Sequence, residues 1–547
     1  MADTAAADAD RVISPGEMRK IIAASSVGTM VEWYDFYIFG SLAAVIASKF
    51  YQTGTPLGDM IAWLAAFAIG FIVRPFGAIV FGRVGDLIGR KYTFLVTMTL
   101  MGICTFAVGC LPTIDKIGPA AGVILIFLRI MQGLALGGEY GGAATYIAEH
   151  APHGKRGFYT SWIQITATAG LFMSLGIILA TKSSMSVEAF SEWGWRIPFL
   201  VSILLIMVSL YIRISLRESP LFAKLKASGQ RSKNPILESF GKKENLKWVL
   251  LALFGATMGQ GVVWYTGQFY ALFYLQKIFH VAFTDSNYII GLALLAATPF
   301  FVVMGALSDK IGRKKIMLAG MLLAVLTYYP IYGLMAANAP ASYKASADDV
   351  KGFEKTAKAA AAAGKDVPMI AIAVEGDTAA TIAGATKVPI TEIKKGDALA
   401  VKHQKFLFDY QGYNPFILWL CVAIQVIYVT MVYGPIAAFL VELFPTKIRY
   451  TSMSLPYHIG NGVFGGLVPI IGLSWVSAQT AAGNPMSNYA GLWWPMGVAG
   501  VCFVVGLFLV KDTHHIDIHA GESIAAAAVT TDEQPDIQVE DVGPDEL

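Results

Sequence analysis

Five charged side chains interrupt long apolar stretches of this 547-residue sequence, and their types and spacing suit proton transfer and anion binding. Glu32 and Asp35 are three residues apart, so they project from neighbouring positions on one helix face. Arg129 and Glu139 share a second apolar stretch, and Arg74 lies in a third. Burial favours the protonated form of a carboxylate, whereas a nearby arginine favours its ionised form. A buried acid that gains and loses an arginine partner can therefore load and release a proton.

Uncharged polar side chains recur in the apolar stretches and could bind a polar organic molecule. Gln132 is seven residues before Glu139 and shares its helix face. A stretch that begins at Thr257 places glutamines, glycines and aromatic residues along one stripe at helical spacing. The alternative for all of these is helix packing with interhelical hydrogen bonds, and for a lone histidine a simple hydrogen bond rather than a proton path. The candidates in the two later stretches are Gln260, Gly261, Trp264, Tyr265, Gly267, Gln268, Tyr457, His458 and Asn461.

The composition indicates which elements position these residues. Hydrophobic residues make up 55% of the chain, charged residues only 14%, and the mean hydropathy is +0.57. Soluble domains carry about 25% charged residues, and a bilayer core needs roughly 20 apolar residues per helix. Apolar blocks of that length recur, so we expect an all-α membrane protein. The twelve predicted transmembrane helices are at residues 20–50, 58–82, 92–112, 118–148, 158–181, 196–216, 248–278, 286–307, 315–337, 413–440, 452–478 and 489–511.

Lysine and arginine are unevenly distributed between the predicted loops. One set of connections is basic throughout, including the long connection at about 217–247, whereas the other set carries few basic residues. Because cytoplasmic loops are enriched in Lys and Arg, we expect the basic set and both termini in the cytoplasm. The N-terminus is polar and acidic up to Asp10, unlike a cleavable signal peptide. The first helix is therefore expected to remain as an anchor.

A ten-residue motif occurs twice in the chain. GRVGDLIGRK runs from Gly82 to Lys91, GALSDKIGRK runs from Gly305 to Lys314, and both fit G-x-x-x-D-x-x-G-R-K. Each copy follows the second predicted helix of a set of six. Self-similarity of this kind indicates an internal repeat, and two parallel six-helix halves are a known plan of membrane transporters.

Each residue type in the motif has a physical use. The first glycine allows close helix approach, the second permits a tight turn, and the aspartate can pair with a basic residue or cap a neighbouring helix. We interpret the two motifs as gates that latch the cytoplasmic ends together in one state; a static turn with solvated charges is the alternative. The gating candidates are Gly82, Asp86, Gly89, Arg90, Gly305, Asp309, Gly312 and Arg313.

The duplicated loops resemble the signature of the major facilitator superfamily. Known members of its metabolite:proton symporter family carry organic acids such as α-ketoglutarate, citrate and shikimate, or osmolytes such as proline and betaine, with protons. The resemblance covers nearly all of the chain except 338–412 and the tails. The stretches that resemble this family are VGTMVEWYDFYIFG (27–40), RIMQGLALGGEYGGA (129–143), WGWRIPF (193–199), LRESPLF (216–222) and ELFPTKIRYTSMSLPYHIGNGVFGG (442–466).

The resemblance implies roles for the charged residues. In related facilitators an acid of the first helix often pairs with an arginine of the fourth, and Asp35 and Arg129 match that pair by position. We predict Asp35 as the proton acceptor and Arg129 as its switchable partner; a permanent ion pair, or a clamp by Arg129 on a substrate carboxylate, are the alternatives. Glu32 is a second candidate for the proton site or for a hydrogen bond to the fourth helix, and Glu139 for an inner gate. Arg129 and Gln132 join the candidates for substrate binding.

The predicted organisation has two related halves and three additional segments. The insertion after the ninth helix contains a predicted short helix near 350–363 and a strand-like segment at 367–374. The C-terminal residues are acidic and poor in aromatics, which predicts disorder. The predicted parts are an N-terminal half at 1–216, a cytoplasmic linker at 217–247, a C-terminal half at 248–511, a periplasmic insertion at 338–412 and a disordered cytoplasmic tail at 512–547.

The leading prediction is proton-coupled import of a small organic acid by alternating access, by a monomer in the bacterial inner membrane. The alternatives are a symporter of proline- or betaine-like osmolytes, with Trp264 and Tyr265 holding a quaternary ammonium, and a non-transporting sensor on the same scaffold. No phosphate-binding loop, metal-ligand cluster or nucleophile elbow is present, so we expect no enzyme activity, cofactor or metal. A net charge of +3 does not indicate nucleic-acid binding.

Overall fold

A computed structural model gives the fold of this protein. The residues that the structure describes are 14–53, 62, 63, 66, 69–214, 218–279, 281, 283–339, 371–374, 378–381, 414–484 and 486–526.

The chain forms two compact units. The first comprises Met1–Tyr270, Leu294–Tyr328 and Ala423–Leu547, and the second comprises Ala271–Ala293 and Tyr329–Val422. All side-chain contacts discussed below lie within the first unit, which contains every predicted site residue.

The first half of the chain is helical. The first long helix begins at a hydrogen-bonded cap, because the Ser14 side chain accepts from the N–H of Glu17 and Pro15 occupies the first turn. The helices of this half are α2 (Pro15–Ser41), α3 (Ala43–Phe50), α5 (Arg74–Leu87), α6 (Arg90–Cys110), α7 (Ile114–Ile117), α8 (Ala120–His150), α9 (Arg156–Ser161), α10 (Ile165–Ser183), α11 (Val187–Ala189) and α12 (Arg196–Ile214).

The second half is also helical, and short π-helical segments interrupt several of its helices. One π segment, η5 (Thr266–Tyr270), directly follows α15. The helices of the linker and second half are α13 (Pro220–Ala227), α14 (Lys243–Ala252), α15 (Met258–Tyr265), α16 (Ala271–Lys277), α17 (Phe283–Ile311), α18 (Arg313–Asn338), α21 (Pro415–Tyr433), α22 (Ile436–Leu443), α23 (Arg449–Ile459), α24 (Val468–Ala481) and α25 (Trp493–Leu509).

The described helices support a chain that crosses the membrane many times. By length and composition, nine helical stretches in the described part of the chain could span a bilayer, and each overlaps one of the twelve predicted spans. The other three predicted spans fall on α2, on α5 with the residues before it, and on the shorter apolar α12. The structure therefore confirms the all-α membrane class, whereas the number twelve stays a prediction.

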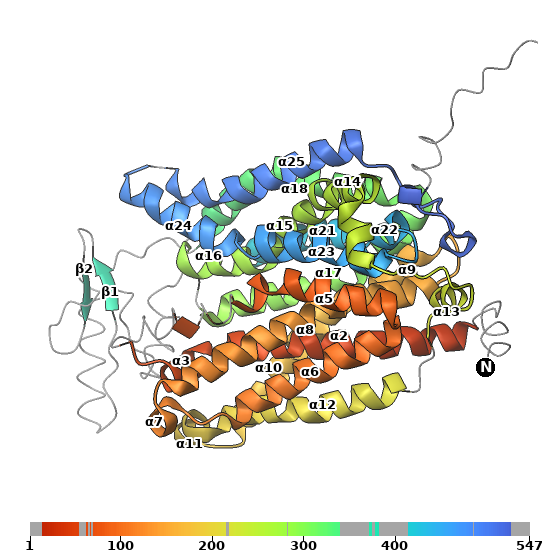
Figure 1. The fold of residues 1–547 in the computed structure, drawn as a ribbon. Coiled ribbons are helices and arrows are strands. Elements are labelled where there is room, and N and C mark those ends of the chain that lie inside the picture. Colours follow the sequence, from red (N-terminus) through yellow and green to blue (C-terminus); the bar gives the residue numbers. More distant parts are fainter. Residues whose placement is uncertain are drawn as a thin grey trace, which may run out of the picture. The chain divides into compact units, whose positions relative to one another are not determined.

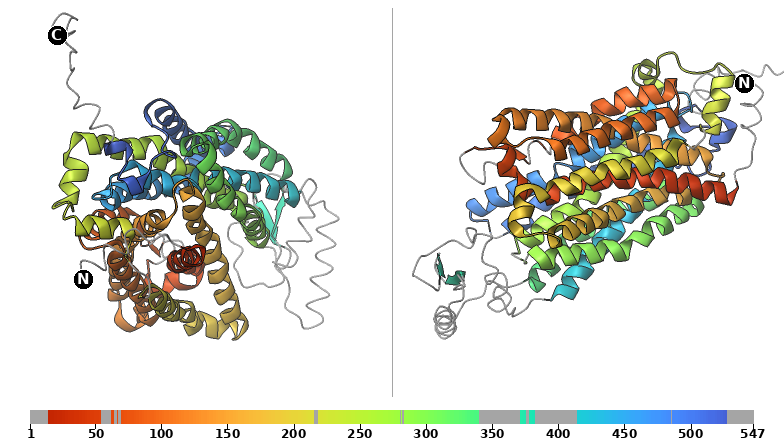
Figure 2. Two further views of the ribbon diagram at one scale, coloured as in Figure 1. Left: turned by 90° about the vertical axis from the view of Figure 1, so that its right-hand side faces the viewer. Right: turned by 90° about the horizontal axis from the view of Figure 1, so that it is seen from below.

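Helix α2, which carries Glu32 and Asp35, packs against α6, α8, α10 and α12. Figure 1 shows these helices running side by side, and the end-on view on the left of Figure 2 shows the red α2 among the orange and brown helices. The Tyr34 hydroxyl donates to the carbonyl of Pro198 at 2.6 Å, and the ring of Phe39 stacks on Trp63. An acid on α2 is thus placed among helices rather than toward lipid.

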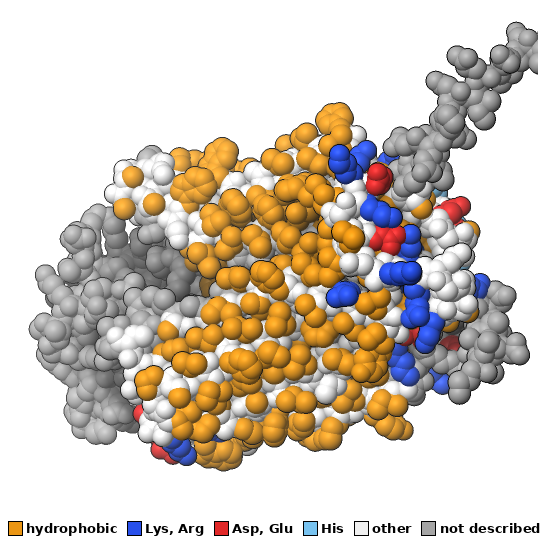
Figure 3. Space-filling view, in the orientation of Figure 1, with side chains coloured by type: hydrophobic (Ala, Val, Ile, Leu, Met, Phe, Trp, Pro, Cys, Tyr) orange, Lys and Arg blue, Asp and Glu red, His pale blue; other side chains and the backbone are white. Residues whose placement is uncertain are grey.

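One end of the first unit is basic. Figure 3 shows apolar side chains over most of the visible face, with Lys and Arg gathered at the end where Figure 1 labels α9, α13 and α22. We call this the basic end. Arg83, Lys155, Arg231 and Lys310 are exposed members of the corresponding loops and helix ends.

Two predictions about the non-helical segments have different outcomes. The expected short helix near 350–363 lies outside the described residues, as does most of 338–412. Within the strand-like segment at 367–374, the structure has β1 (Ala371–Val374), which pairs antiparallel with β2 (Thr378–Thr381).

The predicted disorder of the tail is wrong for residues 512–526. Thr513, Ile518 and Ser523 are buried, and hydrogen bonds hold this segment at the basic end. Overall acidity suggested a solvated tail, but its first residues carry apolar side chains and hydrogen-bonding groups that pack on the protein. Residues 527–547 lie outside the described part of the chain.

Candidate functional site

Asp35 on α2 and Arg129 on α8 are linked through two polar side chains. Thr105 of α6 donates its Oγ1 hydrogen to Asp35 Oδ2 at 2.6 Å and accepts one from Gln132 Nε2 at 2.7 Å. Arg129 Nη1 donates to Gln132 Oε1 at 2.8 Å, and its guanidinium lies 4.1 Å from the ring centroid of Phe39. Asp35, Thr105, Gln132 and Arg129 are all buried. Hydrogen bonds through Thr105 and Gln132 therefore connect the predicted acid to its predicted partner. We call these four residues the relay.

Glycines on α8 allow the relay to lie deep between the helices. A Cβ atom on Gly133 would collide with the carbonyl of Gly70, and one on Gly137 would collide with the carbonyl of Arg74. Helix α8 thus approaches α5 and the residues just before it at van der Waals distance, as small residues permit in membranes. This close approach sets the position along α8 at which Arg129 and Gln132 face α2 and α6.

An aromatic cluster joins the two halves of the chain. The rings of Trp33 and Trp264 have centroids 5.2 Å apart, and Trp264 lies 6.3 Å from Tyr433. The hydroxyls of Tyr433 and Tyr457 are 2.8 Å apart, and the rings of Tyr457 and Tyr140 stack at 3.7 Å. Aromatic faces of this kind can bind a cation as well as apolar groups.

Glu32 lies close to this aromatic cluster. Its charge acts on Tyr140, Tyr433 and Tyr457. Gln164 of the 3₁₀ segment Trp162–Gln164 donates its side-chain N–H to the Tyr140 hydroxyl at 2.9 Å. The two acids of α2 therefore have different environments: among the described residues, Asp35 bonds to Thr105 of the first half, whereas Glu32 lies near tyrosines of both halves.

The predicted stripe from Thr257 divides between two neighbouring helices. Gln260 exchanges two amide hydrogen bonds with Asn461, at 3.1 and 2.9 Å. Gly261 packs on the carbonyl of Gly460, whereas Gly267 packs on Val429 of α21. Gly267 therefore packs against a different helix from Gln260 and Gly261, and the π-helical segment that begins at residue 266 changes the helical register between them. Tyr265 and Gln268 are buried on either side of this transition.

Glu139 and His458 are also buried, in separate environments. Glu139 accepts a hydrogen bond from Thr97 of α6 at 3.2 Å. The ring of His458 faces the backbone of Gly137, and its Nε2 has no hydrogen-bond partner within the described residues. Glu139 therefore contacts the neighbouring helix of its own half, and His458 contacts the opposite half.

At the basic end, Asp86 of the first repeated motif binds the second half of the chain. Its carboxylate accepts from the N–H of Thr451 at 2.8 Å, from the N–H of Tyr450 at 3.3 Å and from the Thr451 hydroxyl at 2.7 Å. It also pairs with Arg90 at 2.9 Å. These N–H groups belong to the first turn of α23, so Asp86 caps a helix of the opposite half.

Asp309 of the second motif makes the equivalent contact with the first half. Its two carboxylate oxygens accept from the N–H groups of Gly157 and Phe158, each at 2.8 Å, at the start of α9. It pairs with Arg313 at 2.6 Å, as Asp86 pairs with Arg90. Each motif thus places its aspartate on a helix N-terminus of the other half.

The motif glycines have the geometry that this arrangement needs. Gly89 and Gly312 have φ of +146° and +110°, a region that side-chain-bearing residues rarely adopt. A Cβ on Gly82 would lie 2.9 Å from the Cα of Thr451, and one on Gly305 would strike Gly157 and Ser161. Both first-position glycines therefore lie where the two halves meet.

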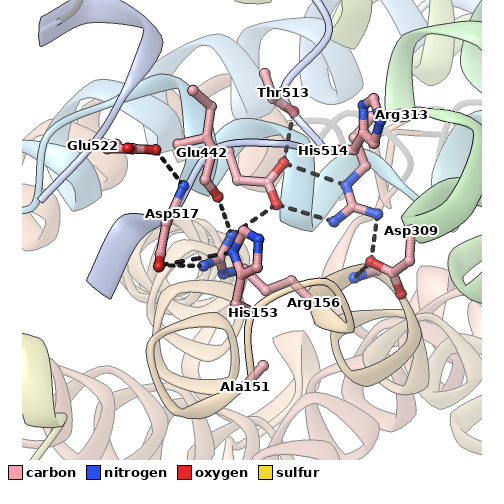
Figure 4. Close-up of polar contacts among 12 residues, drawn as sticks. Ala151, His153, Arg156, Asp309, Arg313, Glu442, Thr513, His514, Asp517 and Glu522 are labelled. Carbon is pink, nitrogen blue, oxygen red and sulfur yellow. Dashed lines mark hydrogen bonds and ion pairs between the residues drawn. The ribbon is translucent and has the colours of Figure 1, made fainter. Parts of the chain in front are cut away.

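Two buried glutamates, which the sequence analysis missed, complete the contacts at the basic end. Glu149 pairs with Arg449 at 2.9 Å and with Arg90 at 3.6 Å. Glu442 pairs with Arg313 at 3.0 Å and with Arg156 at 3.3 Å, as Figure 4 shows. In each cluster a glutamate of one half binds an arginine of the other.

A second sequence repeat could have revealed these residues. Glu149–Arg156 and Glu442–Arg449 both fit E-x-x-P-x-x-x-R, and they follow the fourth helices of the two predicted halves. The pattern is short, and its partners lie about 300 residues away in the sequence. We call the two groups latch clusters. Their members are Asp86, Arg90, Glu149 and Arg449 in the first, and Asp309, Arg313, Glu442 and Arg156 in the second.

The segments that follow α12 and α25 close the latch clusters in equivalent ways. Glu218 accepts from the N–H of Arg90 at 3.2 Å, and the Ser219 hydroxyl donates to Glu149. Asp512 accepts from the N–H of Arg313 at 3.0 Å, and the Thr513 hydroxyl donates to Glu442 at 2.6 Å. Burial raises the pKa of Glu218, although the N–H of Ser219 and the nearby Arg90 oppose this.

The C-terminal segment (residues 510–526) continues across to the first half. The carbonyl of Ile516 accepts from Arg156 Nη1 at 2.7 Å, and Asp517 lies 3.4 Å from Nη2 of the same arginine. His519 Nε2 lies 3.1 Å from the carbonyl of Ala151. Partial burial alone would raise the pKa of Asp517, but the N–H of His519 and the neighbouring basic groups hold it below its usual value. The segment therefore bridges the two halves.

Comparisons with known proteins agree with this architecture. Residues 20–347 match the family described as Sugar (and other) transporter. A putative metabolite transport protein of Haemophilus influenzae is 32% identical over 506 residues, which cover 87% of this chain and 93% of the relative. The proline/betaine transporter of Escherichia coli is 32% identical over 335 residues, which cover 60% of this chain and 67% of the relative.

Solved structures show the same fold. The major facilitator superfamily proton:xylose symporter XylE of E. coli, bound to 6-bromo-6-deoxy-D-glucose, has a TM-score of 0.60 at 14% identity, covering 94% of this chain and 98% of that chain. The family match, the names of the relatives and the many apolar helices identify a membrane transporter rather than an enzyme. The chain belongs to the sugar (and other) transporter family, and its fold is that of the major facilitator superfamily symporter structure.

Proposed function

We propose that this protein is a proton-coupled symporter that imports a small organic acid by alternating access. The observation that carries the proposal is the buried relay from Asp35 through Thr105 and Gln132 to Arg129. Protonation of Asp35 removes a negative charge from this relay and so makes the surroundings of Arg129 more positive. A substrate carboxylate would restore the balance, so proton and anion favour each other's binding.

The latch clusters supply the conformational half of the mechanism. We propose that they hold the basic end closed in one state and separate in the other, while the site near α2, α8 and α15 stays in the middle. The basic end is then the cytoplasmic side of the inner membrane, with both termini on it. Each half keeps its own motif when the halves separate, because Asp86–Arg90 and Asp309–Arg313 are local pairs.

A second candidate substrate class is a zwitterion with a quaternary ammonium group. The aromatic cluster of Trp33, Trp264, Tyr433, Tyr457 and Tyr140, with Glu32 facing it, supports this reading because ring faces and a carboxylate attract cations. One relative is named a proline/betaine transporter. A zwitterion could place its carboxylate toward the arginine and its ammonium toward the rings.

The test is substrate-driven proton movement in proteoliposomes that contain the purified protein. A pH-sensitive dye reports flux when α-ketoglutarate, citrate, shikimate, proline or betaine is added. Proton uptake with one or more of the carboxylates supports the organic-acid proposal. Uptake only with betaine or proline selects the zwitterion candidate, and substrate flux without protons overturns the proposal of symport.

A further inference from the structure

Arg74 lies at membrane depth with an incomplete set of partners. It is the first residue of α5, and its guanidinium sits 4.4 Å from the ring centroid of Phe71. Within the part of the chain that the structure describes, its Nε is buried with no hydrogen-bond partner. An arginine in the membrane normally faces a partner or a functional site, because leaving its charge unmatched is costly.

Two residues of the other half, Trp264 and His458, also have buried polar atoms without a partner among the described residues. Arg74 acts electrostatically on Tyr265 and on His458. The Tyr265 ring contacts Trp264 at 4.9 Å. Among the described residues, neither Nε1 of Trp264 nor Nε2 of His458 has a hydrogen-bond partner, although both side chains are 2% exposed. One cation, one N–H donor and one ring nitrogen are thus left unmatched in this region.

A second cation makes the local charge favourable to an anion. Arg74 and Arg129 act on each other with like charge. Arg129 is already engaged by Gln132 and Phe39, whereas the side chain of Arg74, within the described part of the chain, has the face of Phe71 as its contact. An incoming carboxylate would therefore gain more from Arg74, and it would relieve the repulsion between the two arginines.

We propose that Arg74 is the residue that receives the substrate carboxylate, and that the site takes a small carboxylate carrying at least one hydroxyl group. A hydroxyl both donates and accepts, so it can match the N–H of Trp264 and the ring nitrogen of His458. The inference rests on the proposed function and assigns Arg129 to the proton relay instead of to the substrate. Arg74 joins the first half to the ligand, and Trp264 and His458 join the second.

The experiment measures equilibrium binding to the purified full-length protein by tryptophan fluorescence. The probes are matched pairs that differ in hydroxyl groups: malate and succinate, citrate and tricarballylate, shikimate and 1-cyclohexene-1-carboxylate; methyl shikimate supplies an uncharged ester. The variants are Arg74→Gln and Arg74→Lys, with Arg83→Gln as a control because Arg83 is an exposed arginine on the same helix.

We expect at least one hydroxylated acid to bind the wild type more tightly than its unsubstituted partner. Arg74→Gln should weaken that acid about 30-fold or more, as loss of a charged hydrogen bond implies, and should leave the ester unchanged. Arg74→Lys should lie between, and Arg83→Gln should match the wild type. If Arg74→Gln fails to fold, the acid-to-ester ratio in Arg74→Lys provides the test.

Unchanged acid affinity in the Arg74 variants would overturn the inference while leaving carboxylate symport intact. Binding without preference for hydroxylated acids would remove the assignment of the hydroxyl. If no carboxylate binds the wild type or moves protons with it, the proposed function itself fails, and the Arg74 assignment fails with it.

Discussion

Thr105 gives the buried charges a means of communication that a direct ion pair would lack. Its hydroxyl donates to Asp35 and accepts from Gln132, so the orientation of the hydroxyl depends on whether Asp35 is charged. We expect neutralisation of Asp35 to weaken the first bond and, through Gln132, to change the surroundings of Arg129. On this proposal, a proton on one helix alters the electrostatics of another without a large movement of either side chain.

Replacing Asp35 with Asn should abolish proton-driven accumulation and leave substrate exchange in place. The amide keeps the size of the side chain but cannot take up a proton. We expect accumulation driven by a pH gradient to fall at least about tenfold, which corresponds to about 1.4 kcal/mol, while counterflow of labelled substrate continues. Thr105→Ser, which keeps the hydroxyl, is the matched control. Full proton-driven uptake by the Asn variant would contradict the assignment of Asp35.

Glu442→Gln should open the basic end. Glu442 is fully buried and binds Arg156, Arg313 and Thr513, so its neutralisation leaves two buried guanidinium groups short of a counter-charge. Breaking a buried pair costs about 3–5 kcal/mol, enough to shift a balance between two states. Spin labels on Lys155→Cys and Lys310→Cys, with Cys110→Ser to remove the exposed native thiol, should report longer distances.

Glu244 provides the control for that measurement, because it is an exposed acid on α14. Glu244→Gln should leave the distance distribution unchanged. A Glu442→Gln distribution identical to that of the parent would show that the second latch cluster does not decide closure.

The residues of the two local motifs could be predicted from the sequence. The hydrogen bonds of the relay and the ion pairs of the latch clusters could not. Gly89 and Gly312 were identifiable because a turn within ten residues imposes their geometry. Glu149 pairs with Arg449, which lies 300 residues later in the sequence, and no local periodicity predicts a contact over that separation. Thr105 was missed because a threonine in an apolar helix commonly bonds to its own backbone, as Thr105 also does with Met101.

The C-terminal segment is the element on which sequence and structure differ most. Average composition over 512–547 is acidic, but Ile516 and Ile518 are buried and Asp512 caps α18. Disorder predicted from mean charge fails where a few residues contribute specific contacts. The long helical stretches were predictable because their apolar blocks are long enough to cross a bilayer, whereas the π segment after residue 265 has no comparable signal in the sequence.

Deletion of residues 514–547 should weaken closure of the basic end, and deletion of 527–547 should not. The longer deletion removes the Ile516 carbonyl and the Asp517 carboxylate from Arg156 but keeps Asp512 and Thr513. We expect a larger fraction of long distances between labels at positions 155 and 310, together with a lower rate of uptake. Equal behaviour of the two deletions would show that the segment only rests on the latch.

The contact of His519 should make docking of the C-terminal segment pH-dependent. Burial lowers the pKa of His519 and Arg156 adds to this, while the Ala151 carbonyl and the carboxylates of Asp517 and Glu149 oppose it. The docked histidine therefore binds a proton less well than the released one. Its contribution to docking is fully present above the usual histidine pKa, about 6.5, and decreases as the pH falls below that value.

Hydrogen exchange of residues 512–526, corrected for intrinsic rates, measures this dependence. Exchange should be faster at pH 5.5 than at pH 7.5 in the wild type, and His519→Gln should reduce the difference. An identical pH dependence in the wild type and in His519→Gln would refute the role of His519.

For the whole molecule, the charge distribution predicts orientation. Lys155 is exposed at the basic end, and Lys116 is exposed on the short helix α7, in a connection of the other set. In a Cys110→Ser background, a membrane-impermeant maleimide should label Lys116→Cys in intact cells and reach Lys155→Cys only after permeabilisation. Labelling of position 155 in intact cells would invert the proposed topology.

Each latch cluster combines residues of both halves, and this has a consequence for how such a chain could arise and assemble. In the first cluster, Asp86, Arg90 and Glu149 come from one half, and only an arginine and the start of a helix come from the other. The first half also contains an equivalent arginine and an equivalent helix start, namely Arg156 and the first turn of α9. Two identical copies of one half would therefore form both clusters as an isologous dimer with a two-fold axis. Fusion of duplicated genes would then require no new contact. After fusion, the two halves would be free to diverge everywhere except at the latch clusters.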